Sequence, residues 1–99
     1  MNKYILNTLL EELPHLRQKF NVEELGIFGS GLNVPLDKAN DLDFFIKFKR
    51  PVGLKYFELI DYLEKIFNKK VDVITPEGLK SIKNKTIKDN ISNSILYVN

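Results

Sequence analysis

The sequence predicts an α/β (α+β) domain in which a small mixed β-sheet of about three strands is covered by helices. Two long segments, residues 3–20 and 53–70, carry apolar residues at spacings of three and four, which is typical of amphipathic helices. Three shorter segments rich in Val, Ile, Leu and Phe have the length and composition of strands, namely residues 22–30, 41–48 and 70–75. Helical and strand-like segments alternate along the chain, so a sheet packed against helices is expected.

Size and composition indicate one globular domain, residues 1–99. The chain is 43% apolar and 28% charged, and its formal charge of +2 is too small to indicate a nucleic-acid or membrane surface. No apolar run approaches the roughly 20 residues of a membrane helix, and the N-terminal segment lacks a signal-peptide pattern, so a cytoplasmic location is expected. Cysteine is absent, which excludes disulfides and thiolate metal sites.

Two prolines refine the helical predictions. Pro14 lies inside the first apolar-periodic segment, and proline lacks the amide donor that a helix interior needs, so two helical pieces meeting near Leu13 are expected. Near the other end, Thr75 and Pro76 supply an N-cap and a first-turn proline for a last helix over residues 77–91.

Two aspartates open the second strand-like segment. Side chains of residues i and i+2 project to one side of a strand, so Asp41 and Asp43 present carboxylates about 6.5 to 7 Å apart along the chain. Such a pair repels itself, and Mg²⁺ ions bridging to substrate phosphates would relieve that repulsion. The alternative is that Asp41 caps the preceding loop and Asp43 is solvated at a sheet edge.

A third aspartate, Asp72, lies in the next strand-like segment between Val71 and Val73. This segment is expected to be buried on both faces, where an unpaired carboxylate would be costly. One explanation is a structural salt bridge to Lys47 or Lys69. The other is that the two acid-bearing strands are neighbours, which would bring all three carboxylates together as metal ligands or proton acceptor.

A glycine-serine turn, Gly29-Ser30, ends the first strand-like segment. Backbone amides in such a turn can approach an anion closely, and the Ser30 hydroxyl can donate a further hydrogen bond to a phosphate oxygen. The alternative is an ordinary turn without a ligand. The order along the chain is strand, Gly-Ser, ten residues, Asp-x-Asp and then an acid in a later strand.

This order resembles the minimal nucleotidyltransferases, a family of the DNA polymerase β-like nucleotidyltransferase superfamily. Gly29-Ser30, Asp41-Leu42-Asp43 and Asp72 match the family's signature, and the resemblance extends over nearly the whole chain. It implies the nucleotidyltransferase palm fold. It also implies that Asp41, Asp43 and Asp72 are the catalytic and metal-binding acids, with Mg²⁺ (two ions) as cofactor, while Gly29 and Ser30 hold the triphosphate of ATP as substrate.

The resemblance further implies a partner. Proteins of this kind are often the antitoxins of toxin-antitoxin pairs and transfer AMP to a tyrosine of a helical HEPN-type toxin. The expected function is therefore a Mg-ATP-dependent protein adenylyltransferase, with no membrane partner and no direct nucleic-acid binding. The alternatives are a non-enzymatic module that neutralises its partner by occlusion, and transfer to a small molecule such as an aminoglycoside.

One departure from the family concerns the loop after Gly-Ser. The family usually places an arginine there that helps to hold phosphate, whereas the loop of this chain, "GLNVPLDKAN", contains none. Lys38, Lys47 or a partner protein are the candidate replacements, and both lysines are alternatively solvated surface charges.

Overall fold

The computed structural model describes residues 3–29 and 35–98, which form a four-stranded mixed sheet covered by helices. The strand order is β3-β2-β1-β4. Strand β2 is parallel to β3, whereas β1 is antiparallel to both β2 and β4. The strands are β1 (Val22–Phe28), β2 (Asp41–Phe48), β3 (Lys70–Ile74) and β4 (Leu96–Tyr97). The mixed sheet is confirmed, but the sequence predicted about three strands and missed β4, whose two residues are too few to show periodicity.

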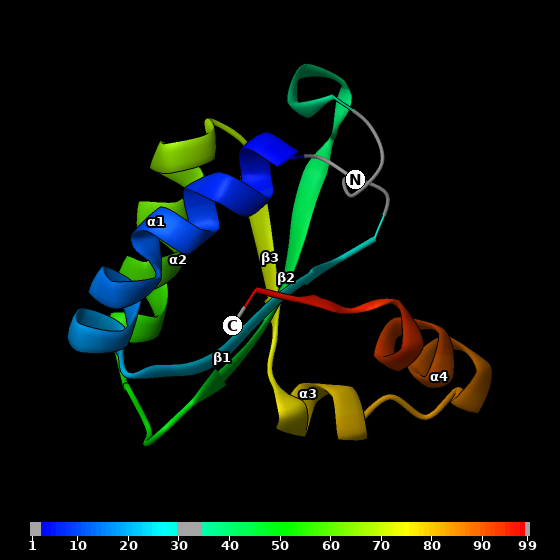
Figure 1. Ribbon diagram of the computed structural model, residues 1–99. Coiled ribbons are helices and arrows are strands. Elements are labelled where there is room, and N and C mark those ends of the chain that lie inside the picture. The colour runs from blue at the N-terminus through cyan, green and yellow to red at the C-terminus, as the bar shows by residue number, and fades with distance from the viewer. Residues whose placement is uncertain (1–2, 30–34, 99) are drawn as a thin grey trace.

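Helices α1 (Lys3–Phe20) and α2 (Lys55–Phe67) pack together on one face of the sheet (Figure 1). The core lies between these helices and the sheet and contains Ile5, Leu9, Leu16, Leu25, Leu42, Phe44, Ile46, Leu59 and Leu63. We call the sheet surface that carries Leu42, Phe44 and Ile46 the core face. The predicted alternation along β2 is confirmed, because these three side chains are fully buried.

The prediction that Pro14 divides the first helix was wrong, because α1 runs without interruption through it. Proline leaves the carbonyl of residue i−4 without an amide partner, and here that residue is Leu10. Both Pro14 and Leu10 are exposed, so water can solvate the free carbonyl. The apolar stripe of Leu9, Leu13 and Leu16 then keeps the two halves of α1 on the same core.

Helices α3 (Pro76–Lys80) and α4 (Lys85–Ser94) lie on the other side of the sheet (Figure 1). The single helix predicted over residues 77–91 is therefore wrong. The cap at Thr75 is confirmed: its hydroxyl accepts a hydrogen bond of 3.2 Å from the amide of Gly78. A second cap, Asn84, accepts a bond of 3.1 Å from the amide of Ile87 and starts α4 separately.

We call the other sheet surface the acid face, because it carries Asp41 and Asp43. Further along this face Phe45 is buried, since its ring contacts that of Tyr97 with centroids 5.8 Å apart. Gly26 lies between them in the sheet, paired with Phe45 on one side and Tyr97 on the other. A Cβ atom at Gly26 would lie 2.5 Å from the Cγ2 atom of Ile95, so the glycine makes room for the residue that precedes β4. None of the helices in the described part of the chain has the length and apolar character to cross a membrane.

Candidate functional site

The acid face brings the three predicted aspartates together at one end of the sheet. Asp43 pairs with Asp72 across the parallel β2 and β3 strands, so the expectation that these strands are neighbours is confirmed. Neighbouring strands lie about 4.8 Å apart, and paired residues project to the same face. Asp41 precedes Asp43 by two residues and shares that face. The three carboxylates therefore belong to one cluster.

The burial predicted for Asp72 was wrong. β3 is an edge strand, and the side chain of Asp72 is exposed. Its neighbours Val71 and Val73 point to the core face, which explains the apolar run in the sequence. The proposed salt bridges to Lys47 and Lys69 are not formed: Lys47 pairs with Glu23 at 3.1 Å, and Lys69 donates to the carbonyl of Asp37 at 3.4 Å.

Asp43 is the central acid of the cluster. It lies between Phe28 of β1 and Asp72 of β3, with Asp41 two residues before it on the same strand. Burial raises the pKa of the Asp43 carboxyl above its ordinary value of 3.8, and the negative charges of Asp72 and Asp41 raise it further. A cation bound at Asp43 would reduce the repulsion, because its positive charge would offset negative charge of the neighbouring carboxylates.

The turn after β1 touches this cluster. Gly29 has a φ of +86°, a conformation that L-residues rarely adopt. A Cβ atom added at Gly29 would lie 2.5 Å from the Oδ2 atom of Asp43. Glycine is therefore needed for both the backbone conformation and the close approach to the carboxylate. Ser30, the other residue predicted to hold phosphate, lies outside the described residues.

A lysine that the sequence analysis missed lies next to the acids. Lys70 pairs with Asp41 across β2 and β3 and lies two residues from Asp72 on the same face. Its side chain is exposed. No local pattern in the sequence indicates this pairing, because it depends on the register between two strands that lie far apart along the chain. Of the two candidate replacements for the missing arginine, Lys47 is engaged with Glu23, and Lys38 lies exposed in the short helix η2 (Leu36–Lys38).

The fit of the cluster to Mg²⁺ depends on its donors. Carboxylate oxygens are the ligands that Mg²⁺ prefers, and one or two of them commonly suffice beside substrate phosphates. Within the described residues, no group of three or more acidic, histidine or cysteine side chains is already gathered around a single point as a metal site. The donor chemistry thus fits an ion that is held partly by the phosphates of the substrate.

A family model described as the nucleotidyltransferase domain matches residues 6–98 of this chain, in agreement with the geometry of the site. The chain belongs to the nucleotidyltransferase domain family. This nucleotidyltransferase is 37% identical over 84 residues to the protein adenylyltransferase MntA of Thermococcus cleftensis, covering 84% of this chain and 85% of that protein. It is also 37% identical over 86 residues to a Methanocaldococcus jannaschii protein named as a candidate protein adenylyltransferase, with coverages of 84% and 83%.

Solved structures show the same fold. The nucleotidyltransferase superposes with a TM-score of 0.68 on a structure described as a candidate minimal nucleotidyltransferase, at 18% identity and with coverages of 97% and 95%. It also superposes with a TM-score of 0.59 on a chain of the MntA-HepT toxin-antitoxin complex, at 14% identity, over 93% of this chain and 70% of that one. The minimal nucleotidyltransferase fold predicted from the sequence is confirmed, and the protein is a transferase.

Proposed function

We propose that this nucleotidyltransferase is an antitoxin that transfers AMP from Mg-ATP to a tyrosine hydroxyl of a HEPN-type toxin. The names of its relatives support protein adenylylation, and the MntA-HepT complex supports a toxin as acceptor. The single observation that carries the proposal is the register of Asp43 with Asp72 beside the Gly29 turn. In this register the carboxylates of Asp43 and Asp72 are neighbours, and the Gly29 turn lies against Asp43.

The reaction follows from these positions. The tyrosine oxygen attacks the α-phosphorus of ATP, the bond from that phosphorus to the bridging oxygen breaks, and pyrophosphate leaves. Asp72 accepts the phenolic proton, because it is the most exposed of the three acids and can be reached by a docking protein. Mg²⁺ held by Asp41 and Asp43 would neutralise charge on the phosphates. Gly29 and Ser30 would hold the triphosphate with backbone amides and the serine hydroxyl.

Lys70 takes the place of the missing loop arginine in this proposal. It lies beside Asp41 and is exposed, so its ammonium can reach a phosphate oxygen at the edge of the acid cluster. Lysine serves well as a point charge toward phosphate. The backbone of Lys70 is part of β3 and is held by the sheet more firmly than the backbone of a loop residue would be.

The decisive experiment is co-expression with the protein encoded by the neighbouring gene, followed by intact-mass measurement of that protein. Mass increments that match one or more AMP units support the transfer, and peptide mapping should place them on tyrosine. Co-purification with an unmodified partner in Mg-ATP would instead support neutralisation by occlusion.

Asp72→Asn should reduce turnover by at least about 10²-fold, the low end for loss of a positioned general base. The melting temperature should not fall, because Asp72 is exposed, forms no ion pair among the described residues and repels the Asp43 carboxylate. Single-turnover transfer of labelled AMP and a thermal melt measure the two effects. A lower melting temperature with activity proportional to folded protein would mean that Asp72 has only a structural role.

Lys70→Met should raise the KM for ATP about tenfold, a typical loss for one charge-assisted hydrogen bond. The turnover number should change less, since Lys70 lies beside Asp41 rather than beside the Asp43–Asp72 pair. Lys83→Met, a change of an exposed lysine between α3 and α4, is the matched control. Equal ATP kinetics in both variants would exclude Lys70 from nucleotide binding.

A further inference from the structure

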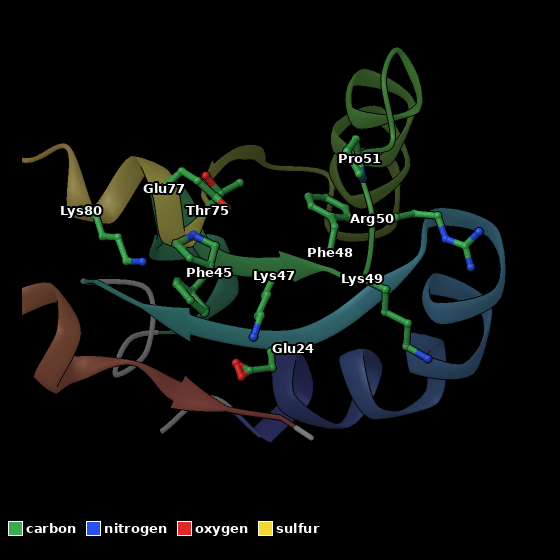
Figure 2. A pocket seen from close by; sticks show the side chains of 11 residues that line it. Glu24, Phe45, Lys47, Phe48, Lys49, Arg50, Pro51, Thr75, Glu77 and Lys80 are labelled. Carbon is green, nitrogen blue, oxygen red and sulfur yellow. The ribbon is translucent and has the colours of Figure 1, made fainter.

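A second feature of the acid face is a groove of about 690 Å³ that none of the three aspartates lines. Figure 2 shows it between α3 on one side and the turn after β2 on the other. We call it the basic groove. Its lining residues are Glu24, Phe45, Lys47, Phe48, Lys49, Arg50, Pro51, Thr75, Pro76, Glu77 and Lys80.

The basic groove begins next to the acid cluster. Phe45 lies two residues after Asp43 on the same face of β2, a separation of about 7 Å. Thr75 similarly follows β3, which carries Asp72. A chain segment lying in the groove would therefore lead directly to the carboxylates. The groove can therefore hold the segment that flanks an acceptor hydroxyl, while the hydroxyl itself lies at the carboxylates.

The lining of the groove contains four cations and two acids, Glu24 and Glu77, so its net charge is positive. Lys47 is held by Glu23 at 3.1 Å and leaves little free charge. Lys80 extends from α3 on one side, and Lys49 and Arg50 extend from the turn on the other (Figure 2). All three cations are exposed. Glu77 lies beside Lys80 on α3 and offsets its charge. The excess positive charge therefore lies at Lys49 and Arg50, where it attracts an acidic partner and repels a basic one.

An exposed apolar surface continues from the groove. The ring of Phe48 packs on that of Tyr56 with centroids 6.3 Å apart, and Tyr56 packs on Phe57 at 5.5 Å. Phe57 is 63% exposed, and Leu54 is 83% exposed. Large apolar side chains exposed beside a charged groove are typical of protein docking sites.

We infer that the basic groove, with Leu54 and Phe57 beside it, is the docking surface for the acceptor protein. It fits an acceptor segment that carries acidic side chains along one edge and apolar side chains along the other. The acidic edge lies against Lys49 and Arg50 of the turn after β2 and extends toward Lys80 of α3, while the apolar edge covers Leu54 and Phe57. This inference rests on the proposed transfer to a protein, because a small acceptor would not need such a surface.

The test separates docking from transfer by measuring binding without ATP. Fluorescently labelled random copolymers of glutamate and tyrosine, and of lysine and tyrosine, serve as acidic and basic aromatic probes. We expect the acidic copolymer to bind and the basic one not to bind. The double variant Arg50→Glu/Lys80→Glu should weaken binding about tenfold, since two attractive charges become repulsive. Leu54→Ser/Phe57→Ser should produce a similar loss through the apolar contacts.

Matched controls lie in the first half of α1, because its other end adjoins the groove, where the carbonyl of Asn21 accepts a hydrogen bond of 2.9 Å from the amide of Lys49. Lys3→Glu reverses an exposed cation there, and Leu10→Ser removes an apolar side chain that is 46% exposed. Both should leave copolymer affinity unchanged. Equal losses in the control and groove variants, or equal binding of the two copolymers, would overturn the inference. It would also be overturned if Arg50→Glu/Lys80→Glu raised the KM for ATP and left copolymer affinity intact, because the groove would then hold the nucleotide.

Failure of the proposed function has a different signature. If wild-type protein binds the acidic copolymer through the groove but leaves no labelled AMP on the copolymer or on the co-expressed partner, the docking surface is supported and the transfer is not. If label is transferred with equal efficiency by wild type and groove variants, the transfer is supported and the docking surface is not.

Discussion

Asp43→Asn is expected to lower the rate of nucleotidyl transfer by about 10³-fold, the upper range for loss of one electrostatic group in an active site. Asp43 is the only one of the three acids that has both others as immediate neighbours, across the strand pair and along β2. Removing its charge therefore disrupts the whole cluster. The rate should be measured with saturating ATP and labelled AMP, so that weaker nucleotide binding does not obscure the change in the chemical step.

Asp61→Asn is the matched control, because Asp61 is an exposed acid on α2, on the opposite side of the sheet. It should keep the wild-type transfer rate. Asp43→Asn should also keep its fold, since amide and carboxylate have nearly the same shape. Wild-type transfer by a well-folded Asp43→Asn protein would remove Asp43 from the catalytic site.

The raised pKa of Asp43 has a consequence for stability in the absence of metal. Burial, Asp72 and Asp41 favour the protonated carboxyl in the folded state. A folded-state pKa above the unfolded value means that stability is highest below the unfolded pKa and falls as the pH rises through the folded pKa. The wild type should therefore lose stability relative to Asp43→Asn as the pH rises from below 3.8 toward neutrality. Denaturant titrations in EDTA across this pH range measure the difference, and a constant difference would contradict the electrostatic account.

Gly29→Ala is expected to lower transfer by about 10²-fold, comparable to a displacement of about 1 Å at a reacting group. The new methyl group would lie 2.5 Å from the Asp43 carboxylate, so either the turn or the carboxylate must move. The positive φ of 86° adds a conformational cost of about 1–2 kcal/mol to the folded state. Transfer rate and free energy of unfolding should both be measured.

Gly53→Ala separates these two effects. Gly53 also has a positive φ, of 59°, but a Cβ atom there would have no neighbour within 4 Å. Its replacement should cost a similar backbone strain and leave transfer unchanged. Equal activity losses in the two variants would show that Gly29 acts only through stability and not through its contact with Asp43.

The sequence by itself determined the elements that periodicity and local chemistry define. The apolar stripes of α1 and α2 and the alternation along β2 were readable because one face of each must enter the core. The cap at Thr75 was readable because it depends on neighbouring residues alone. The spacing of Gly29, Asp41 and Asp43 indicated the family, and that assignment is confirmed.

Only the tertiary structure decided how these elements meet. The exposure of Asp72 depends on β3 being an edge strand, and its neighbouring valines gave the opposite impression. The partnership of Lys70 with Asp41 depends on a parallel register between strands separated by a whole helix. The basic groove combines residues of β1, β2 and α3 with the turn after β2. Strand order, register and approach of distant segments are set by long-range packing, which leaves no local pattern along the chain.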